Sequence, residues 1–182
     1  MERYSLAQRV LHWVIAVMVL GALTVGWTLG TLGFQSTVET FGQAMTNTLY
    51  KYHKTFGILI LGLMLIRIVL KLVLPSPAYD PPLSRFDRIA SGAVHGVLYV
   101  ALVGMAVTGW LGTGASGFPV EFFEWELPKV LDKDRAVGTL LIYTVHGVFG
   151  YVITLCVFLH IGGALKHWLV NKDGVMGRMS LI

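Results

Sequence analysis

The chain contains little charge, a single cysteine and no acidic residue in any of its long apolar segments. Charged residues make up 13% of its 182 residues, against roughly 25% in a soluble domain. The lone Cys156 excludes a disulfide within the chain and any zinc or iron–sulfur site built on cysteines. Metal-transport sites and proton relays in membranes usually use carboxylates or thiols. The absence of Asp and Glu from the apolar segments therefore disfavours both functions.

Hydrophobic residues dominate what is present. They make up 55% of the chain, and its mean hydropathy is +0.69. Four apolar segments, approximately 10–29, 55–74, 90–111 and 138–165, reach the ~20 residues that a helix needs to cross a bilayer. After the third segment, Phe122, Phe123 and Trp125 predict a short interfacial segment. We expect an all-α membrane protein that forms one domain over residues 1–182, a bundle of four transmembrane helices in the lipid bilayer.

The distribution of Lys and Arg predicts the orientation of this bundle. By the positive-inside rule, the side richer in these residues faces the cytoplasm. Nine of the 14 fall on the side of the two termini and the second loop, and five fall on the side of the first and third loops. Both termini are therefore expected to be cytoplasmic. The net charge of +4 follows from this topology and does not indicate nucleic-acid binding.

The histidines fall within or beside the predicted helices, and they occupy two depths. His146 and His160 lie fourteen residues apart in the last segment. This spacing is nearly four helical turns, so both imidazoles lie on one side of the helix, about 21 Å apart along its axis. His53 lies at the periplasmic depth of His146, whereas His12 and His95 lie at the cytoplasmic depth of His160. Two levels of histidine predict two stacked cofactors.

Haem is the cofactor that these levels favour. A haem iron held from both faces needs two imidazoles from different helices at one depth, in an apolar slot. The periplasmic level offers the pair His53 and His146. The cytoplasmic level offers three candidates for two positions. We favour His12 with His160 and place His95 beside the haem, and the alternative is His95 as ligand in place of His12. If each histidine merely hydrogen-bonded a neighbouring helix, the two levels would have no explanation.

Glycines near the histidines support a slot for a flat porphyrin, because a residue without a side chain leaves room for it. Close packing of helices explains any one of these glycines equally well. They are Gly21, Gly26, Gly57, Gly62, Gly147, Gly150, Gly162 and Gly163.

Several stretches of the sequence resemble the bacterial cytochrome b561 family, in an order and spacing that cover nearly the whole chain. Many members of that family carry a second histidine directly after the position of His167, where this chain has Trp168. The stretches are RYSLAQRVLHW at 3–13, YHKTFG at 52–57 with Leu65-Ile-Arg67, Ala93-Val-His95 with Thr108-Gly-Trp110, HGVFG at 146–150, His160, Ala164-Leu-Lys-His167, Asp173-Gly174 and Arg178-Met179.

The resemblance implies a multi-pass protein of the bacterial inner membrane whose four-helix bundle encloses two b haems. It implies His12 and His160 as ligands of the cytoplasmic-side haem, and His53 and His146 as ligands of the periplasmic-side haem. It also implies electron exchange between ubiquinone and a small periplasmic donor or acceptor. Superoxide is the leading candidate for that partner, so the chain is at least an electron carrier and a candidate superoxide:ubiquinone oxidoreductase.

Polar residues at both ends of the bundle are candidate contacts for these groups. His167 and Lys166 are candidates to bind the quinone headgroup, although anchoring of the helix end explains them equally well. Arg67 is a candidate to contact a haem propionate. Lys54, next to His53, is another, and its charge would also attract a small anion.

Two other functions are open at this point. The chain is alternatively a cytochrome b subunit that connects a periplasmic partner enzyme to quinone, as in the wider relatives of the family, the cytochrome b subunits of hydrogenases and formate dehydrogenases. A haem-free metal or proton transporter is the third hypothesis.

Overall fold

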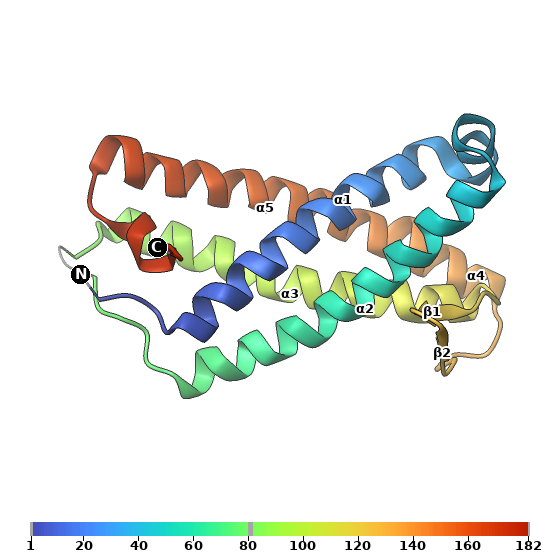
Figure 1. The fold of residues 1–182 in the computed structure, drawn as a ribbon, viewed down its shortest axis with the longest axis horizontal. Coiled ribbons are helices and arrows are strands. Elements are labelled where there is room, and N and C mark those ends of the chain that lie inside the picture. Colours follow the sequence, from blue (N-terminus) through green and yellow to red (C-terminus); the bar gives the residue numbers. More distant parts are fainter. Residues whose placement is uncertain (1, 80–81, 182) are drawn as a thin grey trace.

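The computed structural model describes residues 2–79 and 82–181, and four long helices dominate this part of the chain (Figure 1). The four predicted transmembrane segments lie within these helices, apart from Leu74, which caps the second. The helices are α1 (Leu6–Phe41), α2 (Gln43–Val73), α3 (Arg85–Ala115) and a fourth, composite helix made of α4 (Arg135–Thr139), the π-helix η1 (Leu140–His146), α5 (Gly147–Leu165) and the π-helix η2 (Lys166–Asn171).

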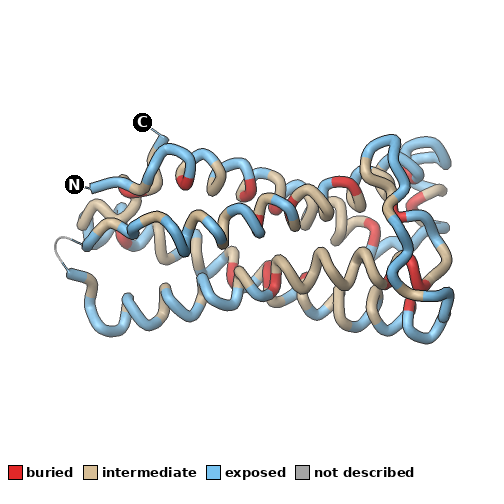
Figure 2. The backbone as a smooth tube through the Cα atoms, turned by 90° about the horizontal axis from the view of Figure 1, so that it is seen from below, coloured by how far each residue is buried: buried red, intermediate tan, exposed pale blue. Residues whose placement is uncertain are grey.

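Each of the four helices is long and apolar enough to cross a bilayer. Many large apolar side chains on these helices are exposed, and Figure 2 shows exposed residues on parts of each helix. Examples such as Leu72, Val100 and Phe158 are at least 70% exposed. An apolar surface of this extent is typical of a protein that is surrounded by lipid. The predicted four-helix membrane bundle is confirmed.

The connection between the first two helices differs from the loop that we predicted. The helix α1 continues to Phe41, with a kink at Gly33 (φ 70°), and a single residue, Gly42 (φ 80°), separates it from α2. Both backbone angles lie in the region that favours glycine. The predicted loop was wrong because hydropathy marks only the apolar part of each helix. Both α1 and α2 continue as helix into the more polar sequence between the apolar segments.

The aromatic segment after α3 forms a β-hairpin, which the sequence did not reveal. Strands β1 (Val120–Phe122) and β2 (Trp125–Leu127) pair antiparallel, with Val120 opposite Leu127. Phe123, in the turn, has a φ of 56°. Its backbone N–H donates to the Thr55 hydroxyl (3.2 Å), and this hydroxyl donates to the Glu121 carbonyl (3.3 Å). The hairpin is therefore fastened to α2 close to His53. We call this end of the bundle the hairpin end.

Both chain termini lie at the opposite end (Figure 1), which we call the terminal end. The last described residues fold back as η3 (Val175–Met179) over the start of α1. The guanidinium of Arg178, only 4% exposed, donates to the Pro77 carbonyl and lies 3.7 Å from the ring centroid of Tyr79. The Trp13 indole N–H donates to the Met179 carbonyl (2.8 Å). The C-terminal segment thus closes this end of the bundle.

The buried core lies between the two levels of histidine. Ile153, seven residues from both His146 and His160, is fully buried. Burial of apolar side chains here excludes water from the middle of the bundle. The core consists of Ile15 and Val19 from α1, Ile60 and Met64 from α2, Ala101 from α3 and Ile153 from α5.

Candidate functional site

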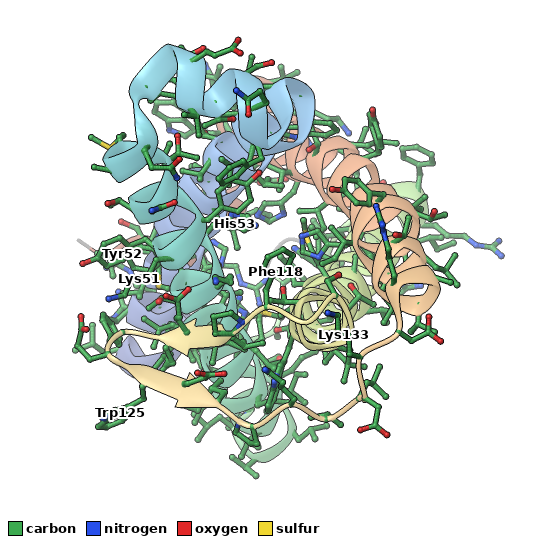
Figure 3. The ribbon with its side chains drawn as sticks, turned by 90° about the vertical axis from the view of Figure 1, so that its right-hand side faces the viewer. Lys51, Tyr52, His53, Phe118, Trp125 and Lys133 are labelled. Atoms are coloured by element: carbon green, nitrogen blue, oxygen red, sulfur yellow. The ribbon has the colours of Figure 1, made fainter. Side chains whose placement is uncertain are left out.

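Two histidines from different helices face each other at the hairpin end. His53 comes from α2 and His146 is the last residue of η1, and their ring centroids lie 6.2 Å apart with 78° between the ring planes. Figure 3, viewed from this end, shows His53 directed into the interior of the bundle, whereas Trp125 lies at its periphery. The His146 Nδ1 lies 2.9 Å from the Met105 carbonyl of α3. As the donor in this hydrogen bond, Nδ1 leaves Nε2 free to bind a metal.

An apolar cavity of about 50 Å³ adjoins this pair. Helices α1, α2, α3 and α5 all contribute to its walls, and no charged residue lines it. The lining residues are Val19, Ala22, Leu23, His53, Gly57, Ile60, Leu102, Met105, Ala106, His146 and Ile153.

Three histidines meet at the terminal end. His12 on α1 and His160 on α5 have ring centroids 6.0 Å apart, with 74° between the planes. His95 on α3 lies closer to His160, at 5.0 Å between centroids. The cytoplasmic-level set predicted from sequence is therefore brought together, with His160 at its centre.

The spacing of the rings tests whether these histidines fit a haem iron. A metal–imidazole nitrogen bond is about 2 Å long and each ring centroid lies a further ~1 Å behind its nitrogen, so two imidazoles on one metal have centroids about 6 Å apart. The pairs His53–His146 and His12–His160 both meet this value. At 5.0 Å, His95 and His160 are too close together to hold one iron between them. The residues present therefore fit two haems, with His95 beside one of them.

The two histidine pairs also lie between helices that pack little on each other, where a flat group has room. Helix α1 packs extensively on α2, and α3 packs extensively on α5, whereas α1 meets α5 over a much smaller interface. Both histidine pairs join α1 or α2 to the fourth helix. The imidazoles therefore face each other where direct packing between helices is sparsest.

Charged and polar groups surround the terminal-end histidines. The Arg67 Nε donates to the Tyr99 hydroxyl (3.1 Å), and Nη1 donates to the Gln8 carbonyl (3.5 Å). Arg67 is close enough to His12 and His160 to act on both electrostatically. A cation at this position is suited to an anionic group such as a propionate.

The hairpin end has cations too, but acidic side chains of the hairpin bind them. Lys54 forms an ion pair with Glu121 and donates to the Pro119 carbonyl (3.0 Å). Lys51 pairs with Glu124 at 2.8 Å. Lys54, which we predicted as a propionate contact or an attractant for anions, is thus engaged in fastening the hairpin to α2.

The two residues predicted to bind quinone, His167 and Lys166, both interact with acidic side chains. The His167 Nδ1 lies 2.5 Å from an Asp173 carboxylate oxygen, and His167 is 8% exposed. The Lys166 ammonium lies 2.6 Å from an Asp87 oxygen of α3. Both side chains therefore hold the end of the fourth helix in place. An open cavity of about 640 Å³ lies next to them, lined by Trp168, Leu169, Lys172, Gly174, Met176 and Gly177.

Sequence reasoning missed two features that position His146. One is the Met105 carbonyl, a backbone group for which the sequence carries no signal. The other is the π-helix η1, which ends at His146. Such wide turns inside a helix occur frequently at functional sites. Gly109, which faces the His146 ring, was also missed, although it stands within the family-like stretch Thr108-Gly-Trp110.

Four spanning helices with two inward-facing histidine pairs define a membrane protein of the haem-binding class. The sequence model of the prokaryotic cytochrome b561 family matches residues 3–180, and the chain belongs to this family. It is 27% identical to cytochrome b561 homolog 2 of Escherichia coli (strain K12), over 98% of this chain and 91% of that protein. It is 24% identical to cytochrome b561 homolog 1 of the same organism, over 98% and 97%.

Family membership confirms the resemblance seen in the sequence. The chain is a multi-pass bacterial membrane protein and a transmembrane b-type cytochrome for electron transfer. Haem-free metal or proton transport is accordingly disfavoured.

Proposed function

We propose that the chain carries electrons across the bacterial inner membrane through two b haems. His53 and His146 hold one haem, and His12 and His160 hold the other. The observation that carries this proposal is the pair of centroid separations, 6.2 Å and 6.0 Å, each suited to one intervening iron. When bound, the haems supply the reversible one-electron chemistry that the transfer requires.

The chain sets the distance between the two proposed haem sites and excludes water from the space between them. Fourteen residues of helix separate His146 from His160, which corresponds to about 21 Å along the axis. Ile153 and the core around it fill the space between the two levels. An apolar layer excludes water and ions while leaving a short path for electrons between the haems.

We place the terminal end in the cytoplasm and the quinone there. Nine of the 14 Lys and Arg residues belong to this side, which supports the orientation. The cavity beside Trp168 is also lined by the apolar Leu169 and Met176 and by Lys172. These groups suit a quinone ring and its carbonyl oxygens. His167 and Lys166, through Asp173 and Asp87, hold the helix that forms one wall.

We place the hairpin end in the periplasm, where a small redox partner exchanges electrons. Superoxide is the first substrate to test. The five Lys and Arg residues of this side are outnumbered by six acidic ones, so long-range attraction of an anion is weak. Superoxide would therefore react at a rate that depends little on ionic strength.

Haem content of purified variants tests the two-haem assignment. We expect two haems per chain in the wild type and one in either His146→Ala or His160→Ala, because a haem with a single axial histidine is held weakly. A redox titration followed at the visible haem bands should lose a different step in each variant. A wild type with one haem, or two variants that lose the same step, would contradict the assignment.

Rapid mixing identifies the substrates. Superoxide and a short-chain ubiquinol are added separately to the oxidised protein, and haem reduction is followed by absorbance. Reduction by superoxide that is abolished in His146→Ala, together with reduction by quinol that is impaired by Trp168→Ala, supports the proposal. Absence of reaction with superoxide rejects it as the donor and leaves the haem assignment intact.

A second function is favoured by the exposed end of the hairpin. Trp125 is 72% exposed at the periphery (Figure 3), as expected of a residue that anchors in lipid headgroups or contacts a protein. A cytochrome b subunit that connects a periplasmic enzyme to quinone would use such a contact. Affinity purification in mild detergent separates the two functions, because an enzyme recovered with the wild type and lost in Trp125→Ala would establish the subunit role.

A further inference from the structure

Two glycines lie directly against the imidazoles of the hairpin-end pair. A Cβ atom added to Gly26 of α1 would lie 3.0 Å from the His53 Cε1. A Cβ atom added to Gly109 of α3 would lie 3.1 Å from the His146 Cε1 and 3.3 Å from its Nδ1. Contacts this short require the neighbour to move. Each ring is thus backed by helix backbone, which approaches it only because the residue is glycine.

These contacts are made to the imidazole atoms that determine where the metal-binding nitrogen points. In imidazole, Cε1 is bonded to both ring nitrogens, so a displaced Cε1 carries Nε2 with it. Nε2 is the nitrogen directed at a metal when Nδ1 is the hydrogen-bond donor. Other glycines lack such a contact. Gly30 and Gly57 have open space where a Cβ would lie, and so do four glycines in the terminal-end halves of α3 and α5, which are Gly92, Gly96, Gly162 and Gly163.

The two imidazoles are restrained unequally. His146 is held by the Met105 carbonyl as well as by Gly109. The His53 Nδ1 is buried and has no well-formed hydrogen bond to the described residues, although the backbone of Ala22 lies near it. Its orientation consequently depends on contact with Gly26 to a greater extent.

We propose that Gly26 and Gly109 are positioning residues that set the orientation of the His53 and His146 rings and thereby tune the hairpin-end haem. This inference rests on the proposed two-haem function. Gly26 acts on His53 by contact alone. Gly109 acts on His146 by contact and by leaving room for the hydrogen bond to Met105. Neither residue reaches the terminal-end pair.

The proposal predicts different spectroscopic signatures for the two sites. In Gly26→Ala the added methyl group turns His53, which shifts the low-spin EPR signal of the hairpin-end haem or converts part of it to high spin. In Gly109→Ala the hydrogen bond from Nδ1 weakens, so the imidazole donates less charge to the ferric iron. The midpoint potential of that haem then rises. The EPR signal and potential of the terminal-end haem stay unchanged in both variants.

Two control variants separate this role from general packing. Gly30→Ala, one turn after Gly26, adds a methyl group to open space and should leave both haems as in the wild type. Gly104→Ala places a Cβ 2.6 Å from the Phe149 ring and so strains the α3–α5 contact without touching either histidine. It should lower thermal stability and leave the hairpin-end potential unchanged.

Several outcomes would overturn the proposal. One is a pair of glycine variants whose hairpin-end EPR signal and potential match the wild type. Another is a Gly104→Ala protein with the same change as Gly109→Ala. Loss of both haems from Gly26→Ala, with both retained in Gly30→Ala, would show a general packing role instead. A wild type that binds fewer than two haems would refute the proposed function itself, and is distinguishable from all of these.

Discussion

The two histidine pairs have nearly the same separation but very different surroundings. At the hairpin end, apolar side chains and two glycines enclose the rings, and the nearby lysines are bound to the hairpin. At the terminal end, Arg67 and a third histidine lie beside the pair. For the two haems that we propose, we therefore expect ligand orientation to tune the hairpin-end site and charge to tune the terminal-end site. Two histidine pairs of similar spacing should then differ in midpoint potential.

The largest effect should come from the proposed haem ligands of the terminal end. We expect His12→Ala to lose one of the two haems, whereas His95→Ala keeps both, because only His12 stands at the separation from His160 that one iron needs. Haem quantification of both purified variants measures this. The reverse result would make His95 the ligand, and the centroid separation would then not identify the ligand pair.

Ile153 separates the two ends, and its truncation should weaken the whole bundle. Ile153→Ala leaves a cavity in a fully buried position, which costs about 2–5 kcal/mol of the free energy of unfolding. Thermal unfolding of the haem-loaded protein in detergent reports the loss. Cys156→Ala, at a smaller buried side chain in the same helix, is the control and should cost less. Equal losses would show that the middle layer is not specially packed around Ile153.

Arg67 is the group through which charge should distinguish the two proposed haems. A nearby positive charge favours the reduced iron, so Arg67→Gln should lower the midpoint potential of the terminal-end haem. A charge about 10 Å away at an effective dielectric constant of ~20 contributes about 1–2 kcal/mol, and 1.4 kcal/mol corresponds to about 60 mV for one electron. A two-step redox titration checks the prediction. An equal shift of both steps would contradict the local action of Arg67.

The smallest effect concerns the closure of the terminal end by Asp173. Burial raises the pKa of Asp173, but hydrogen bonds from His167, the Val175 N–H and Asn171 outweigh it and hold this pKa below its ordinary value. A depressed pKa in the folded protein means that the carboxylate stabilises the fold above the unfolded pKa of about 3.9, and that this stabilisation is lost as the pH falls through the lower folded value. A hydrogen bond of this kind contributes about 1 kcal/mol net.

Limited proteolysis of the C-terminal segment as a function of pH measures this release. Cleavage after residue 172 should increase below about pH 4, near the ordinary carboxylate pKa. The Asp173→Asn variant should be cleaved at all pH values to the extent that the wild type is cleaved in acid. Protection that does not depend on pH in the wild type would show that other contacts, such as those of Arg178 and Trp13, close this end without Asp173.

Much of the architecture follows from the sequence, because length and hydropathy determine which segments can span a bilayer. The levels of the histidines follow as well, since helical rise converts residue number into depth. The sequence also favoured His12 over His95 as the partner of His160, and the centroid separations of 6.0 Å and 5.0 Å support that prediction. The ion pairs of Lys54 and His167 with Glu121 and Asp173 join residues far apart or in irregular turns, which no periodicity predicts.

The fold-back of the C-terminal segment also bears on how the bundle assembles. The Arg9 guanidinium donates to the Ser180 carbonyl and the Trp13 indole N–H donates to the Met179 carbonyl, across 171 and 166 residues of sequence. Contacts between segments so distant in sequence are expected to form after the helices between them have packed. We therefore expect the start of α1, with the surroundings of His12, to become ordered in the last step of folding.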